Sequence, residues 1–317
     1  MRIGHFKALV SKNQNNEITL LFILIVLVIV FSTFSEGFFK IGNMLEISAQ
    51  MVELSLLTLG MSVCIISGGF DLSIGAMVGL SSVCLAILIS SGMNMGLTIA
   101  LVFGLLLFCG LINGILVGYL RINSMLVTLG TSSVFIGIAI VISQGRAISG
   151  LTQEFAVFGQ HYLGVIPVQT IILIVVAAFS LLILSYSTWG RRIYLIGSNY
   201  EVARFAGINC GFNIMLVYVY SAAMAFLASL ILTSRLATGR ADFGETYILQ
   251  SVAAAVFGGI GINGGSGNLF GAILGVAVFA IISNGFNMLD FSQYAQQIVI
   301  GLILIVFLAY RAQHNQA

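Results

Sequence analysis

Glu53 and Asp71 are the two acidic residues in or beside long apolar runs, so they are the side chains that could do chemistry inside a membrane. A carboxylate at membrane depth is costly, which makes a functional role the default hypothesis for both. Asp71 lies in the segment SGGFDLSIG, where its carboxylate could accept backbone donors at the start of the following helix. We prefer that structural role to ion coordination. Glu53 lies near the start of an apolar run and is expected to reach the external membrane interface.

Other patterns typical of catalytic or cofactor-binding proteins are weak. Gly259-x-Gly261-x-x-Gly264 has the spacing of a dinucleotide fingerprint, but an apolar run precedes it and no strand-turn-helix unit surrounds it. The sequence has no Gly-Lys pair and hence no P-loop, so any ATP that powers this protein must bind to another chain. The apolar runs lack histidine and paired acids, which disfavours an intramembrane enzyme, a metal site and a proton relay. The three histidines are His5, His161 and His314.

The composition is that of an integral membrane protein. Of the 317 residues, 59% are hydrophobic and 7% are charged, whereas about a quarter are charged in soluble domains. One proline and a net charge of +2 give no basis for disorder or for nucleic-acid binding. Recurrent apolar windows predict an all-α polytopic bundle of about ten transmembrane helices in a single domain, residues 1–317. The predicted spans are Ile18 to Phe34, Ala49 to Ser67, Gly75 to Ser91, Leu97 to Leu120, Met125 to Ile142, Thr170 to Tyr186, Phe212 to Thr233, Leu249 to Ile262, Leu269 to Phe286 and Gln296 to Tyr310.

The basic residues set the orientation, because lysine and arginine are enriched in cytoplasmic loops. With the N-terminus inside, eight of the twelve basic residues are cytoplasmic, and most acidic residues are external. Both termini are therefore predicted to be cytoplasmic. The same orientation places the charged segment Gly190 to Asn209, between the sixth and seventh spans, in the cytoplasm.

Ten spans divide into two halves of five, and an odd number gives the halves opposite topology, a frequent transporter arrangement. Glycines at four-residue spacing occur in the fourth span and again where the ninth begins. Such ridges let helix backbones approach closely in lipid, although a chain with 36 glycines could also hold two of them by chance. The predicted packing glycines are Gly110, Gly114 and Gly118 in one half and Gly267, Gly271 and Gly275 in the other.

The third and eighth spans are interrupted or introduced by glycine. Unwound backbone is tolerated at membrane depth only where protein or a water-filled cavity satisfies it, so broken helices at matched positions point to a substrate path. The predicted break and lining residues are Gly68, Gly69, Asp71, Ser73 and Gly75 at the third span and Gly258, Gly259, Gly264 and Gly265 at the eighth.

The segment Gly190 to Asn209 is a charged island that carries the signals of a short helix. Ser198 and Glu201 have the spacing of a capping box, in which each side chain satisfies a backbone donor at the helix start. Gly207 offers a left-handed stop.

Within that helix Val202 and Phe205 fall on one side, while Glu201 and Arg204 are offered to solvent or to a partner. A helix of two turns is marginal alone in water, so it is expected to pack on something. The segment is either a docking helix, which we favour, or a well-capped surface loop.

Four blocks of this sequence resemble the permease subunits of bacterial sugar ATP-binding-cassette importers, the ribose, xylose, arabinose and galactose class. GGFDLSIG at Gly68 to Gly75 is similar to that family's Gly-Gly-x-Asp-Leu-Ser-x-Gly motif. The other three blocks follow in register across most of the chain. They are GLINGILVGYLRINSMLVTLGT at Gly110 to Thr131, IGSNYEVARFAGIN at Ile196 to Asn209 and VFGGIGINGGSGNLFGAILG at Val256 to Gly275.

The resemblance implies a subunit of the bacterial inner membrane that pairs with a second permease copy or a close homologue. It implies two cytoplasmic ATPase subunits, which would carry ATP and Mg while this chain binds no cofactor, and an external substrate-binding protein. The cytoplasmic segment 190–209 would couple to the ATPases. The coupling residues that it implies are Gly197, Ser198, Asn199, Glu201, Ala203, Arg204, Gly207 and Ile208.

Two places depart from the family pattern. Ser124 and Met125 stand where relatives commonly have a Pro-Phe pair, and Ile248 and Gln250 stand where an acid is common. These departures bear on the substrate more than on the fold. An ion-coupled secondary transporter is the alternative, because five plus five spans fit it as well. Such a transporter needs ion ligands at membrane depth, where this chain offers two carboxylates.

Overall fold

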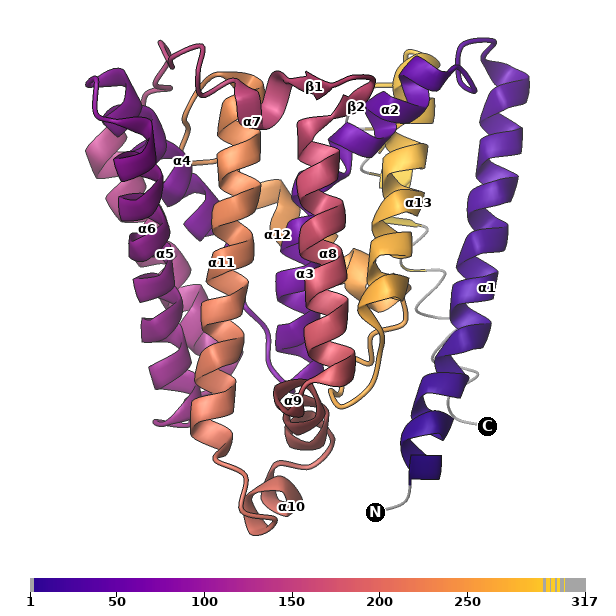
Figure 1. Cartoon of the computed structure of the whole chain (residues 1–317), viewed down its shortest axis with the longest axis vertical. Coiled ribbons are helices and arrows are strands. Elements are labelled where there is room, and N and C mark those ends of the chain that lie inside the picture. The colour runs from indigo at the N-terminus through magenta and orange to yellow at the C-terminus, as the bar shows by residue number, and fades with distance from the viewer. Residues whose placement is uncertain (1–2, 293–294, 297, 300, 303–304, 306–317) are drawn as a thin grey trace.

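The computed structural model describes residues 3–292, 295–296, 298–299, 301–302 and 305. The long helices lie side by side, with α10 at one end of the bundle and α7, β1 and β2 at the other (Figure 1). We call these the α10 end and the α7 end. The elements are α1 (Ile3–Phe34), α2 (Ile41–Gln50), α3 (Val52–Ile66), α4 (Ile74–Ser90), α5 (Met95–Gly118), α6 (Ser124–Ser143), α7 (Val157–Gln160), β1 (Tyr162–Leu163), β2 (Ile166–Pro167), α8 (Val168–Tyr186), α9 (Thr188–Ser198), α10 (Tyr200–Phe205), α11 (Cys210–Leu236), α12 (Glu245–Phe257) and α13 (Leu269–Met288).

The prediction of an all-α polytopic membrane protein is confirmed. Among the described residues, six helices are long and apolar enough to cross a membrane, namely α5, α6, α8, α11, α13 and the part of α1 from Asn16 to Phe34. The second predicted span, Ala49 to Ser67, covers α3, which continues α2 with a bend of 40°. The third and eighth predicted spans are the shorter helices α4, with 17 residues, and α12, with 13. The tenth, Gln296 to Tyr310, lies for the most part outside the described residues.

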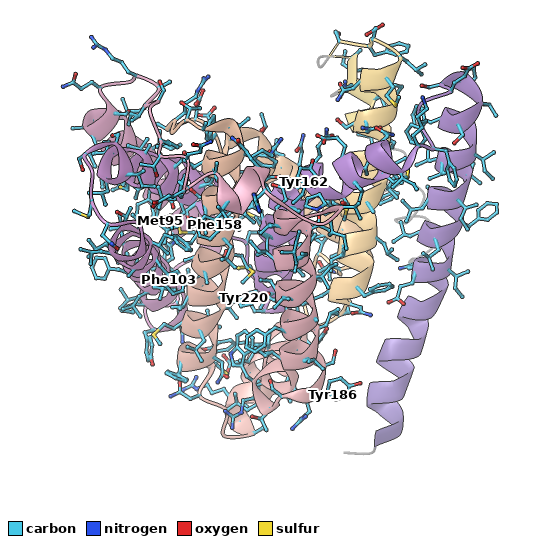
Figure 2. The ribbon with its side chains drawn as sticks, turned by 45° about the horizontal axis from the view of Figure 1, so that its top comes forward. Met95, Phe103, Phe158, Tyr162, Tyr186 and Tyr220 are labelled. Atoms are coloured by element: carbon cyan, nitrogen blue, oxygen red, sulfur yellow. The ribbon has the colours of Figure 1, made fainter. Side chains whose placement is uncertain are left out.

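Helix α8 shows how the bundle fits a bilayer. Its 19 residues span about 28 Å at ~1.5 Å per residue, close to the ~30 Å of a hydrocarbon core. Tyr162 and Tyr186, near its two ends, are both exposed (Figure 2). Tyrosine is enriched where membrane meets water. Exposed Ile, Leu, Val and Phe side chains cover the outer faces of α1, α5, α6 and α8, which is the surface that lipid requires.

Two interrupted hairpins form the centre of the bundle. In the first, α3 is followed by the non-helical segment 67–73 and then by α4; in the second, α11 is followed by segment 237–244 and then by α12. The second helix of each hairpin packs on the first helix of the other, α4 on α11 and α12 on α3. Gly75 at the start of α4 touches Gly244 just before α12. This reciprocal packing agrees with two halves of opposite topology, as predicted.

The buried core lies around α3. All fifteen residues of α3 are buried, whereas α5, α6 and α8 each bury one face. A helix that is apolar on every side must be surrounded by protein or by lipid, and here α3 is surrounded by α8, α11, α12 and α13. The first break therefore begins from the most enclosed helix of the bundle.

Candidate translocation and coupling site

The first break starts with glycine. Gly68 has φ +91°, a conformation that suits glycine because it has no Cβ. The N–H of Gly68 donates to Ile65 and that of Gly69 donates to Cys64, so the last carbonyls of α3 are satisfied as the chain turns away. The predicted interruption of the third span is therefore present, and it comes before α4.

Side chains from other helices satisfy the unwound backbone of this break. The N–H of Phe70 donates to Ser124 Oγ at 3.2 Å, and the N–H of Leu72 donates to Thr128 Oγ1 at 3.0 Å. The carbonyl of Phe70 accepts a hydrogen bond from the Tyr218 hydroxyl at 3.2 Å. Unpaired backbone groups are costly in a membrane, so α6 and α11 stabilise the break.

Ser124 is one of the two departures noted above, and the structure gives it a contact. A proline at this position would have no hydroxyl to accept the Phe70 N–H. The helix start that proline would stiffen is capped here by Asn123, whose side chain accepts the N–H of Met125 at 2.9 Å.

Asp71 is fully buried and ties the break to two neighbouring helices. Its Oδ1 accepts the N–H of Ser73 at 3.1 Å and the Ser73 hydroxyl at 2.6 Å, and its Oδ2 accepts the Ser221 hydroxyl at 2.7 Å. Ser73 Oγ in turn accepts from Asn113 Nδ2 at 2.8 Å. Asp71 thus accepts a backbone donor at the start of α4, the structural contact that we predict. Its place in a substrate path stays a prediction.

The expectation that Glu53 reaches the membrane interface is wrong. Glu53 is completely buried, and Arg235 Nε lies 2.8 Å from its Oε1. The pair joins the start of α3 to the end of α11 at the α7 end of the bundle. Because Arg235 lies 182 residues away in the sequence, the short-range pattern around Glu53 gives no sign of it.

The second break connects α12 to α13 through a loop rich in glycine. Gly259, Gly264, Gly265 and Gly267 all have positive φ, from +68° to +128°. The N–H of Gly261 donates to Ser266, and the N–H of Gly264 donates to Gly261, so the loop folds tightly on itself. The dinucleotide-like spacing falls within this connection between two helices, a context without the strand, turn and helix of that fingerprint.

The first predicted ridge lies against α11. Cβ atoms added at Gly110 and Gly118 would come 2.6 Å from the Tyr218 carbonyl and 2.5 Å from the Gly211 carbonyl. At Gly114, an added Cβ would lie 2.7 Å from Met215 Cα. Glycine is therefore the residue that lets α5 approach α11 at this distance.

The second predicted ridge differs from the first. Gly271 and Gly275 pack against the end of α12, at Gly258 and Ala254. Gly267 lies before α13 and packs on Ile260. The first ridge thus joins different halves, whereas the second joins neighbouring helices of one half. The two ridges are not counterparts, so the repeat rests on the reciprocal hairpins instead.

The charged island Gly190 to Asn209 folds as two helices, α9 and α10. The predicted Ser198 and Glu201 capping box is wrong, because Ser198 ends α9 and its hydroxyl donates to the Leu195 carbonyl. The residue that caps α10 is Asn199, whose Oδ1 accepts the N–H of Val202 at 3.0 Å. Asparagine accepts such a bond as well as serine does, and it starts the helix one residue later.

Gly207 has φ +79° and ends this helix as predicted, with the N–H of Ile208 donating to the Ala203 carbonyl. Ala203 is buried, whereas Val202 and Phe205 are 59% and 87% exposed. The predicted apolar side of α10 is therefore largely exposed within the described part of the chain.

Charged side chains surround the exposed pair of α10. Arg204 lies 3.8 Å from Glu201, and both are more than half exposed. The Arg121 guanidinium, on the turn between α5 and α6, lies 5.1 Å from the centroid of the Tyr200 ring, within cation–π range. This contact joins α10 to that turn.

A cavity of about 560 Å³ lies between the first break, the turn before α6 and the start of α10. Its lining combines polar side chains and backbone groups of the break with apolar side chains and two charged residues, Arg121 and Glu201. The lining includes Ser67, Gly68, Asn123, Ser124, Asn199 and Tyr218. Gly68 and Gly69 of the predicted break and Gly197, Ser198, Asn199 and Glu201 of the predicted coupling residues therefore line one cavity.

A comparison with protein-family models decides the class of this protein. Residues 43–308 match the family described as the permease component of the branched-chain amino acid transport system. The chain belongs to this permease family. It is a multi-pass membrane protein. The broken hairpins and α10 are therefore parts of a permease.

Curated relatives cover most of the permease. The ribose import permease of Bacillus subtilis is 34% identical over 89% of this chain and 88% of the relative. The D-allose transport system permease of Escherichia coli is 32% identical over 91% and 89%. The autoinducer 2 import system permease of Klebsiella pneumoniae is 28% identical over 94% and 92%. No solved structure matches the chain.

Several residues of the permease site are absent from the sequence prediction. Ser124, Thr128, Tyr218 and Ser221 satisfy the first break from other helices, and Arg121 holds α10. Ser124 and Thr128 carry a weak signal, because polar residues four apart at a helix start lie on one face. The contacts of Tyr218 and Ser221 with the break, 148 and 150 residues away, have no local signal.

Proposed function

We propose that this chain is the transmembrane permease subunit of an ATP-binding-cassette importer that carries a sugar or sugar-like solute across the bacterial inner membrane. Two separate ATPase subunits power it and hold ATP and Mg. A second permease copy or close homologue and an external binding protein complete the importer. In the orientation predicted from the basic residues, the α10 end and both termini are cytoplasmic.

The observation that carries this proposal is the exposed apolar pair on α10. A short helix in water gains little from propensity alone, and Phe205 at 87% exposure contributes nothing to packing within the described residues. An aromatic side chain beside an arginine is the composition typical of binding hot spots. A partner that covers Val202, Arg204 and Phe205 would remove this apolar surface from water.

The substrate class follows from the charges at membrane depth. A zwitterionic amino acid needs an acidic and a basic partner, whereas a sugar needs hydroxyl, amide and backbone groups. Among the described residues, Glu53 is paired with Arg235, and Asp71 is bonded to the hydroxyls of two serines. The cavity beside the break offers asparagine, serine and tyrosine side chains. Its two charged lining residues, Arg121 and Glu201, lie against the Tyr200 ring and beside Arg204. The relatives named for ribose and D-allose support a sugar, although the family description names amino acids.

Two substitutions on α10 test the docking of the ATPases. Phe205→Ala and Arg204→Glu should leave membrane insertion intact, because both side chains are more than half exposed. Each should weaken ATPase co-purification by more than roughly fivefold if the residue is a hot spot worth over ~1 kcal/mol. Uptake of labelled ribose, D-allose and leucine by cells with the complete importer should fall in parallel and should identify the substrate class.

Matched controls lie elsewhere on the chain. Phe39→Ala removes a phenylalanine that is 70% exposed near α2, and Arg146→Glu reverses an exposed charge after α6. Neither should change ATPase association as much. Undiminished association and uptake in both α10 variants would reject the docking role. Uptake that persists in cells without the ATPases would instead favour an ion-coupled transporter.

A further inference from the structure

Three backbone segments meet at one point near the α10 end. They are the last turn of α9 at Gly197 and Ser198, the first break at Ile66 to Gly68, and the second break at Gly264 and Gly265. The N–H of Gly265 donates to the Ile66 carbonyl at 2.8 Å, so the two breaks are bonded to each other directly. We call this contact the glycine junction.

The junction has no room for side chains. A Cβ added at Gly197 would clash with the Ile66 carbonyl, and one at Gly265 would lie 2.6 Å from Ser198 Cα. A Cβ at Gly264 would lie 2.9 Å from the Gly197 carbonyl oxygen and 3.0 Å from Gly68 Cα. The main chains of the three segments therefore pack directly on one another, so one segment cannot shift far without displacing the other two.

A further bond fixes α9 to the second break. The Tyr194 hydroxyl donates to the Gly267 carbonyl at 2.7 Å. Burial raises the pKa of Tyr194 to about 12, so the hydroxyl keeps its proton at physiological pH. Helix α9 thus holds the loop of the second break at both Gly265 and Gly267.

We propose that Gly197 and Gly264 are positioning residues of a rigid joint that makes the first break and the loop between α12 and α13 move together with α9 and α10. This proposal rests on the proposed function, in which ATPases act on α10. A force on α10 passes to α9 through the single residue Asn199. The junction then transmits it to both breaks at once, because displacing α9 alone would break the backbone contacts on both sides.

Gly264→Ala tests the joint, and Gly92→Ala is its matched control. The two glycines have nearly the same φ, +82° and +81°, so alanine adds similar backbone strain at each. They differ in surroundings, because a Cβ at Gly92 would meet nothing within 4 Å. For Gly264→Ala we expect unchanged ATPase co-purification and continued ATP hydrolysis. Ribose uptake should fall roughly tenfold, a typical size for lost coupling.

Gly197→Ala, compared with Gly104→Ala in open space on α5, should show the same separation of hydrolysis from uptake. Wild-type uptake in both junction variants would overturn the proposal. So would loss of ATPase association in step with uptake, because that result would assign the junction to folding. Failure of the proposed function is visible separately, as wild-type uptake that does not depend on the ATPases.

Discussion

The ridge on α5 allows one substitution to be compared at two positions with opposite expected effects. Gly104 and Gly114 both lie inside α5, but Gly104 is exposed and a Cβ there would meet nothing within 4 Å. A Cβ at Gly114 would lie 2.7 Å from Met215 Cα, whereas ordinary contact begins at 3.4 Å. Alanine at position 114 therefore requires α5 and α11 to separate by about the difference, 0.7 Å.

The free energies follow from these distances. In a helix interior alanine is favoured over glycine by about 1 kcal/mol, and this gain is common to both variants. Overpacking of a close contact costs about 1–3 kcal/mol, and Gly114→Ala alone incurs it. Gly104→Ala should therefore be neutral or stabilising. The free energy of unfolding of Gly114→Ala should be about 1–3 kcal/mol lower than that of Gly104→Ala.

Thermal unfolding of the purified permease in one detergent measures the comparison, with both variants and the wild type at equal protein and lipid content. The Tm of Gly114→Ala should lie a few degrees below that of Gly104→Ala. Equal Tm values would refute the reasoning, because they would mean that α5 and α11 separate at no cost. Uptake measured on the same variants should decrease in the same order.

Two further comparisons, each of two variants, use the same unfolding measurement. Arg235→Ala leaves Glu53 buried and unpaired and should lower the free energy of unfolding by about 3–5 kcal/mol. Glu53→Gln should lower it less, because Arg235 is 27% exposed and can reach water. Equal losses in the two variants would contradict the pairing. Ser221→Ala removes a hydroxyl that donates to the buried Asp71 carboxylate and should lower the free energy of unfolding by about 1.5–3 kcal/mol. Ser55→Ala removes a buried hydroxyl without a hydrogen-bond partner among the described residues, so it should change that free energy little. A Ser55 variant as unstable as the Ser221 variant would argue against that bond.

The sequence predicts the helices of this fold well, because the signal for a membrane span is local and strong. Runs such as Leu97 to Leu120 and Thr170 to Tyr186 coincide with α5 and α8 to within a few residues. The short helices α4 and α12 are harder to predict. Helix α4 is as apolar as a full span although it is buried inside protein, whereas α12 buries only its C-terminal part and is less apolar. Apolar composition does not distinguish burial in protein from contact with lipid.

The predicted α10 helix shows a second limit. The serine and asparagine at positions 198 and 199 are both good caps, and Glu201 three residues after Ser198 favours the first. The structure uses Asn199 because α9 continues through Ser198, where backbone contacts with Gly265 hold it. A tertiary contact thus decides between two local alternatives of similar free energy.

The breaks themselves combine a local signal with a distant one. Glycine at Gly68 and Gly259 marks where the chain leaves α3 and α12, and this can be predicted from composition because few other residues tolerate positive φ. What makes the unwound backbone stable is non-local. Phe70 is satisfied by Ser124 and Tyr218, which lie 54 and 148 residues away. A broken helix at membrane depth needs such hydrogen-bond partners. A predicted break therefore implies that partners exist, but it does not indicate which residues they are.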